Sequence, residues 1–80
     1  MFSQLRTGSK VVGIKQSRRA ILEDKAACVF FAQDADPHVT APLLALCQEK
    51  AVVVETVDSM KELGAACGIS VGAAVAVLLK

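Results

Sequence analysis

The stretch Ala27-Cys28-Val29-Phe30-Phe31-Ala32 is an uninterrupted apolar run, and it sets the architecture expected for the whole chain. A short run of this kind, rich in aromatic and β-branched residues, predicts a strand that is buried on both faces. Further strands are expected at Val52–Thr56 and Ala74–Leu79, with a short one at Val11-Val12. The sequence therefore predicts a central sheet that is covered on both sides.

Helical segments separate these strands. One helix is expected from about Lys15 to Glu23, and a second enters through Asp36-Pro37 and runs to about Glu49. A third follows the capping box Ser59-Met60-Lys61-Glu62 and ends near Gly68, and a short basic helix is expected at about Phe2 to Arg6. Strands that alternate with helices indicate the α/β class, as a three-layer α/β/α sandwich.

Length and cysteine content limit the possible classes of protein. A chain of 80 residues is expected to form a single domain, 1–80. Cys28, Cys47 and Cys67 lie far apart without a C-x-x-C pair, so they predict buried, reduced thiols and neither a metal site nor a cofactor. Reduced thiols and the absence of a signal-peptide pattern favour a cytoplasmic protein.

The segment Leu63–Leu79 contains no charged residue, and it spaces Gly64, Gly68 and Gly72 as G-x-x-x-G, a pattern found in pairs of membrane helices. The run falls short of about 20 residues and is weakly hydrophobic at its centre. A helix that ends at Gly68 and a buried strand that follows explain the segment better. No membrane partner is expected.

Charge is distributed unevenly, although the net charge is only +1. The first 22 residues carry no acid, and their cations are Arg6, Lys10, Lys15, Arg18 and Arg19. The remaining residues carry four lysines against eight acids. A basic end on a near-neutral body suits local contact with a nucleic acid, while an ordinary solvated face explains five cations equally well.

The segment Gly13-Ile14-Lys15-Gln16-Ser17-Arg18-Arg19 places a glycine, an amide and three cations where a helix is expected to begin. A helix start has unpaired N–H groups and partial positive charge, so it favours anions. Lys15, Gln16 and Arg19 are three or four residues apart and can project from one side of the helix. The segment therefore predicts a patch that binds phosphates and base edges.

Two acids and the single histidine offer little catalytic chemistry. Asp34 and Asp36 are spaced like paired carboxylates, but Asp-x-Asp-Pro is more typical of a turn in which Asp36 caps a helix begun by Pro37 and Pro42. His38 has no second histidine and no nucleophile–base pair beside it. The chain is not expected to be an enzyme.

Three segments in order resemble a known family: Gly13-Ile14-Lys15-Gln16 with Arg19, then Phe31–Pro37, then Leu63–Val71. The chain resembles the kink-turn RNA-binding ribosomal proteins of the L-seven-Ae / L-thirty-e type, and within them the small bacterial members of the YbxF and YlxQ kind. The resemblance covers about Lys10 to Leu79. It implies a three-layer α/β/α sandwich with a central mixed four-stranded sheet.

The resemblance also implies a site. Its first part opens the helix that contacts tandem sheared G·A pairs, with Lys15 and Gln16 in place of the family's Asn-Glu pair. Its second part is an apolar loop that packs on an extruded nucleotide; the alternative for Ile69 and Val71 is that they are core residues entering the last strand. The RNA-binding residues expected are Gly13, Ile14, Lys15, Gln16, Arg18, Arg19, Ile69, Ser70 and Val71.

By resemblance, we expect a monomeric RNA-binding protein that stabilises a kink-turn in ribosomal RNA or in a kinked leader element and is associated with the ribosome. Lys15 cannot accept a hydrogen bond, and Gln16 lacks the charge of a carboxylate. A second hypothesis therefore stays open, in which the protein is a ribosome-associated interaction or assembly module with the same fold but without sharp kink-turn readout.

Overall fold

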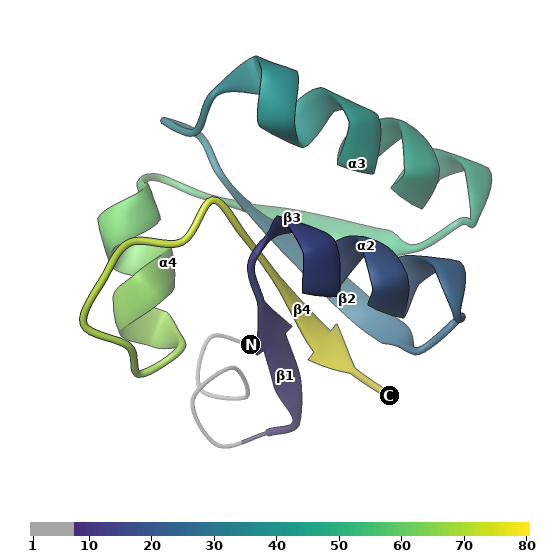
Figure 1. The fold of residues 1–80 in the computed structure, drawn as a ribbon, viewed down its shortest axis with the longest axis horizontal. Helices are drawn as coiled ribbons and strands as arrows, with labels where there is room; N and C mark the ends of the chain where they lie inside the picture. Colours follow the sequence, from purple (N-terminus) through teal and green to yellow (C-terminus); the bar gives the residue numbers. More distant parts are fainter. Residues whose placement is uncertain (1–7) are drawn as a thin grey trace.

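The computed structural model describes residues 8–80. Its elements are β1 (Lys10–Val12), α2 (Ile14–Leu22), β2 (Ala26–Ala32), α3 (Pro37–Glu49), β3 (Val53–Val57), α4 (Met60–Ala66) and β4 (Val75–Leu79) (Figure 1). Each helix and strand predicted within this range is present, and the predicted bounds differ by one or two residues at most ends. The helix expected at Phe2 to Arg6 lies outside the described residues.

The sheet is mixed and has the order β1-β4-β2-β3. The last strand, β4, runs antiparallel to both β1 and β2, whereas β2 and β3 are parallel. The run in β2 is buried as predicted from Cys28 to Ala32, because this strand lies inside the sheet and is covered on both faces, whereas Ala27 is exposed. The expected three-layer sandwich with a mixed four-stranded sheet is therefore confirmed.

Alternate side chains of β2 supply the two cores. Val29 and Phe31 face α2 and α3, while Cys28 and Phe30 face α4. The core under α2 and α3 contains Ala20, Ile21, Ala26, Val29, Phe31, Leu43, Cys47, Val75 and Val77. The core under α4 contains Cys28, Phe30, Ala32, Ala35, Val57, Leu63, Cys67, Ala73 and Ala76.

The three cysteines are buried, as predicted, and none forms a disulfide within residues 8–80. Burial raises the pKa of the thiols of Cys28, Cys47 and Cys67, so the neutral thiol is the favoured form. In the same part of the chain, no three His, Cys, Asp or Glu side chains gather in a way that could hold a metal ion.

The glycine-spaced segment after Leu63 is divided into a helix end, a loop and a strand. Gly68 follows α4 with a φ of +79°, and its N–H donates to the Ala65 carbonyl oxygen. The next N–H, from Ile69, donates to the Gly64 carbonyl oxygen, which completes a Schellman motif. Among residues 8–80, no helix combines the length and apolar character needed to cross a membrane.

The topology brings several connections to one edge of the sheet. The strands β1, β2 and β3 end at this edge, and β4 begins there, because Val12 pairs with Ala76 and Phe31 pairs with Val75. Consequently α2, α3 and α4 all start near the same edge, and the loop before β4 arrives there too (Figure 1).

The opposite ends of α2 and α3 both use a non-glycine residue at positive φ. Asp24 has a φ of 59° and Ala51 a φ of 57°, and each lies in a Schellman-type helix end. The Lys50 Nζ lies 3.1 Å from the Asp24 Oδ1 and joins the two helix ends. A left-handed conformation costs energy for any residue with a Cβ, so Ala51 carries strain that glycine would not.

We expect Ala51→Gly to raise the free energy of unfolding by about 0.5–1 kcal/mol. Glycine removes the strain of the positive φ in the folded state, and this exceeds the cost of ordering the more flexible glycine backbone on folding. Urea denaturation measures this change. The control is Ala45→Gly in the middle of α3, which should lower stability by about 1 kcal/mol. A loss of stability in both variants would contradict the account of Ala51.

Candidate functional site

The chain turns from β1 into α2 at Gly13. Its φ of +105° favours glycine, and its N–H donates to the Val75 carbonyl oxygen at 3.1 Å. The Gly13 carbonyl oxygen accepts the Ser17 N–H at 3.0 Å, which begins the helix. No side chain within residues 8–80 caps α2. The first N–H groups of α2 therefore remain available to an anion.

The other two helix starts at this edge are capped. The Asp36 Oδ1 accepts the His38 N–H at 2.9 Å at the start of α3, as predicted. At the start of α4, the Ser59 hydroxyl accepts the Glu62 N–H at 3.1 Å, and the Asp34 Oδ1 accepts the Met60 N–H at 2.7 Å. Of the three helix starts in the described structure, only that of α2 lacks a side-chain cap.

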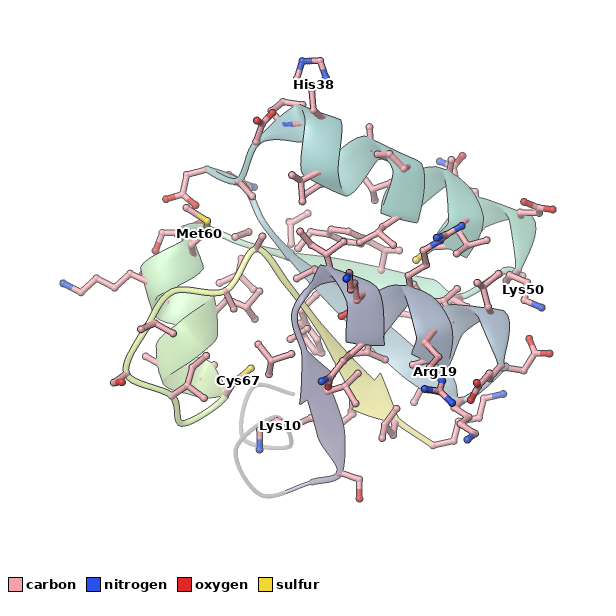
Figure 2. All side chains as sticks on the ribbon, in the orientation of Figure 1. Lys10, Arg19, His38, Lys50, Met60 and Cys67 are labelled. Carbon is pink, nitrogen blue, oxygen red and sulfur yellow. The ribbon has the colours of Figure 1, made fainter. Side chains whose placement is uncertain are left out.

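The structure corrects one detail of α3. Pro37 lies at the first position of the helix as expected, but Pro42 lies inside it and does not help to start it. A proline there removes one backbone donor. His38 points away from the protein at the start of α3 (Figure 2).

The exposed side of α2 brings together most of the predicted polar residues. Lys15, Gln16, Arg18 and Arg19 are exposed, whereas Ser17 is fully buried. Arg19 lines one hollow together with Lys15 and another together with Gln16, so it lies between them. This is the arrangement that the spacing of three and four residues predicts.

Arg19 is also part of an ion-pair cluster that the sequence reasoning missed. The Arg19 Nε donates to the Glu23 Oε2 at 2.9 Å, and the Lys25 Nζ lies 3.1 Å from the Glu23 Oε1. The hydrogen bond from Arg19, and then that from Lys25, holds the pKa of the Glu23 carboxyl below its ordinary value. The i,i+4 spacing of Arg19 and Glu23 was the signal that could have found this pair.

Two other cations of α2, Lys15 and Arg18, form no ion pair with the described part of the chain. Their charges are therefore not offset by a neighbouring carboxylate. Because both side chains are exposed, they can reach a phosphate without first breaking an internal contact.

The loop between α4 and β4 holds the other predicted residues at the surface. Ile69 is 36% exposed and Val71 is 69% exposed, and Ser70 is exposed as well. The alternative in which Ile69 and Val71 are core residues is therefore wrong. The buried residues that lead into the last strand are instead Ala73 and Val75.

Two glycines explain why this loop lies so close to α4. A Cβ on Gly64 would clash with the carbonyl oxygen of Val71, and one on Gly72 would lie 3.2 Å from the Met60 Cβ. The Ala73 N–H also donates to the Met60 carbonyl oxygen at 3.0 Å. The loop backbone therefore rests directly on α4, and Met60, itself 37% exposed, lies at the start of that helix (Figure 2).

The last part of the loop runs to the start of β4, close to the start of α2 (Figure 1). The hydrogen bond from Gly13 to Val75 holds the start of α2 at this point. The loop reaches the same point through the chain from Ala73 into Val75. The two predicted sets of residues are 50 positions apart in sequence at their nearest (Ile69 minus Arg19), and both are linked to the start of β4.

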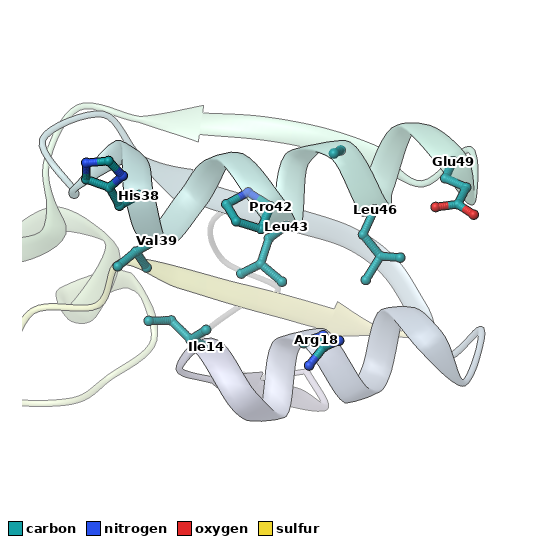
Figure 3. A pocket seen from close by; sticks show the side chains of 9 residues that line it. Ile14, Arg18, His38, Val39, Pro42, Leu43, Leu46 and Glu49 are labelled. Carbon is teal, nitrogen blue, oxygen red and sulfur yellow. The ribbon is translucent and has the colours of Figure 1, made fainter.

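An apolar groove of about 520 Å³ separates α2 from α3 (Figure 3). Ile14 and Arg18 form one side of it, and Val39, Pro42 and Leu46 lie on the other. No sequence signal identified this groove, because its two walls come from helices whose relative position depends on how both pack on the same face of the sheet.

An uncapped basic helix start and an exposed apolar loop, both on an α/β sandwich, are features suited to contact with a nucleic acid. The chain belongs to the Ribosomal protein L7Ae/L30e/S12e/Gadd45 family, which it matches over residues 3–80. The resemblance noted from the sequence is thereby confirmed. The protein is an RNA-binding protein of this family and not an enzyme.

Similar proteins agree with this assignment. The chain is 50% identical to an RNA-binding protein of Bacillus pumilus, over 89% of this chain and 88% of that protein. It is 45% identical to the RNA-binding protein YbxF of Geobacillus stearothermophilus, over 95% and 93%. A solved structure, the Giardia lamblia 15.5kD RNA binding protein, has a TM-score of 0.91 and 28% identity, covering 99% of this chain and 70% of that one.

Gly64→Ala should displace the loop, because the added Cβ cannot share space with the Val71 carbonyl oxygen. We expect a loss of about 2 kcal/mol or more in the free energy of unfolding, on the scale of overpacking. Gly68→Ala is the matched control: nothing lies within 4 Å of its Cβ, so only the strain of its positive φ, about 1 kcal/mol, applies. Equal losses in the two variants would argue against the close contact.

Proposed function

We propose that the protein recognises and stabilises kink-turn RNA, in which tandem sheared G·A pairs lie beside an extruded nucleotide. The observation that supports this proposal is that the uncapped start of α2 is hydrogen-bonded to the first residue of β4, and that the exposed loop Ile69–Val71 leads into this same strand. One region suits paired bases and phosphates, and the other suits an unstacked base. A kinked RNA presents both within a short distance.

The start of α2 supplies hydrogen bonds and positive charge. Its free N–H groups and Lys15 bind phosphate oxygens or guanine acceptors. Gln16 offers both a donor and an acceptor, so it can pair with a base edge that carries both. Arg18 and Arg19 add charge along the next turn, where their exposed side chains contact the backbone of the RNA.

The loop supplies an apolar surface. Val71 and Ile69 are already exposed in the free protein, so packing a base on them removes apolar surface from water without reorganising the core. Ser70 adds a hydroxyl group that can donate to or accept from the extruded nucleotide. The backbone contact of the loop with α4 keeps these side chains in place before RNA binds.

Binding acts by a population shift. RNA exchanges between extended and bent forms, and a protein that binds only the bent form stabilises it by its own binding free energy. No chemical step is involved. We further propose that the partner is ribosomal RNA or a kinked leader element, and that the protein acts as a monomer in the cytoplasm in association with the ribosome.

A second function, a protein-interaction or assembly module on the ribosome, is favoured by the apolar groove between α2 and α3. Such a module would need the groove and would not need Lys15 or Gln16. Leu46→Asp in the groove separates the two functions, since it should leave kink-turn binding intact while abolishing association through the groove.

The proposal is tested by titrating the protein with a kink-turn RNA and with a copy that lacks its G·A pairs. We expect the intact kink-turn to bind more tightly by at least about tenfold, since each lost base contact costs about 1–3 kcal/mol. Equal affinity for the two RNAs at moderate salt would overturn the proposal.

Lys15→Ala should weaken binding to the kink-turn and lower the slope of log K against log salt by about one unit, as expected for a lost phosphate contact. The control, Ser17→Ala, lies on the buried side of the same helix turn and removes a hydroxyl without a hydrogen-bond partner in the described structure. It should leave both affinity and slope unchanged. An unchanged slope for Lys15→Ala would exclude its phosphate contact.

Val71→Ser should weaken kink-turn binding by about 1–3 kcal/mol, the scale of a lost contact with an unstacked base. The thermal midpoint should change little, because the Val71 side chain is largely exposed. Val53→Ser on β3 is the matched control, since Val53 is 57% exposed and lies far from the loop along the chain. If the two variants bind RNA alike, Val71 makes no contact with it.

A further inference from the structure

In its ion pair with Glu23, Arg19 uses only one of its three guanidinium nitrogens as a hydrogen-bond donor. Glu23 accepts a hydrogen bond from the Nε of Arg19, which is the nitrogen nearest the aliphatic stem. The two terminal Nη groups donate no hydrogen bond within residues 8–80. These terminal groups are the ones that form a fork for two parallel hydrogen bonds to a phosphate or to guanine O6 and N7.

The contact also fixes the guanidinium group in space. The Arg19 side chain is 80% exposed, so without a partner it would sample many rotamers. A bond to Nε holds the plane of the group and leaves its outer edge open. Holding a flexible side chain in one position before binding reduces the entropy lost when RNA binds.

Glu23 would repel phosphates if its charge were not offset. Its second oxygen, Oε1, lies 3.1 Å from the Lys25 Nζ, so both carboxylate oxygens are engaged by cations. The three side chains together carry one net positive charge. Glu23 can therefore orient Arg19 without making this part of the surface negative.

We infer that Glu23 is a positioning residue for RNA readout, whose carboxylate holds the Arg19 guanidinium with its terminal nitrogens directed to the RNA. This inference rests on the proposed kink-turn function. The alternative role makes the opposite prediction. If Glu23 only competed with RNA for Arg19, it would weaken RNA binding, and its removal would tighten RNA binding.

A comparison of Glu23→Gln with Glu23→Ala tests the inference. Both variants raise the net charge of the protein by one, but only glutamine keeps an oxygen that can accept the Arg19 Nε–H. We expect Glu23→Gln to bind the kink-turn RNA about threefold more tightly than Glu23→Ala, a modest factor because the pair is exposed. Equal affinities, or tighter binding by Glu23→Ala, would overturn the inference.

The same comparison in an Arg19→Ala background isolates the role of Arg19. If Glu23 acts through Arg19, the difference between the glutamine and alanine variants vanishes there. A difference that persists would assign Glu23 a role in helix stability instead, which contradicts the inference. Circular dichroism of all variants shows that the comparison is made between folded proteins.

The two proposals can fail separately. If the unmodified protein binds a kink-turn and a copy without G·A pairs equally well, the proposed function fails. If it distinguishes them and Arg19→Ala weakens binding, but the two Glu23 variants bind alike, only the positioning role of Glu23 fails.

Discussion

The placement of β4 between β1 and β2 is the constraint on which the rest of the structure depends. The strand β4 pairs antiparallel with both β1 and β2, so β1 is connected to the rest of the sheet only through β4. The first residue of β4, Val75, accepts the Gly13 N–H and so fixes the start of α2. The start of α2 is thereby tied to the strand into which the loop Ile69–Val71 leads.

Glycine is needed at two places for two different reasons: a positive φ at Gly13 and a close backbone approach at Gly64. Gly13 adopts a positive φ at the turn into α2, where no side chain caps the helix, and the absence of a cap leaves its N–H groups open to an anion. Gly64 lets the loop backbone contact α4, which leaves Ile69 and Val71 exposed. In both places a missing side chain creates a surface that a ligand can use.

The charges of α2 serve two different purposes. Lys15 and Arg18 have no ion-pair partner within residues 8–80 and face solvent, as long-range attraction of a polyanion requires. Arg19 is instead paired with Glu23, which partly offsets its charge and holds its guanidinium group in one orientation. Association and recognition thus draw on neighbouring residues of one short helix.

The sequence by itself determined the elements and the layers, and it predicted which polar residues share one side of α2. Apolar runs such as Ala27–Ala32 predict buried strands, and cap residues such as Asp36 and Ser59 mark helix starts, because these signals are local. Only the tertiary structure decided that Ile69 and Val71 are exposed, that Glu23 holds Arg19, and that a groove separates α2 from α3. Burial, side-chain contacts and grooves depend on which segments meet in space, and here that is set by the long-range pairing of β4.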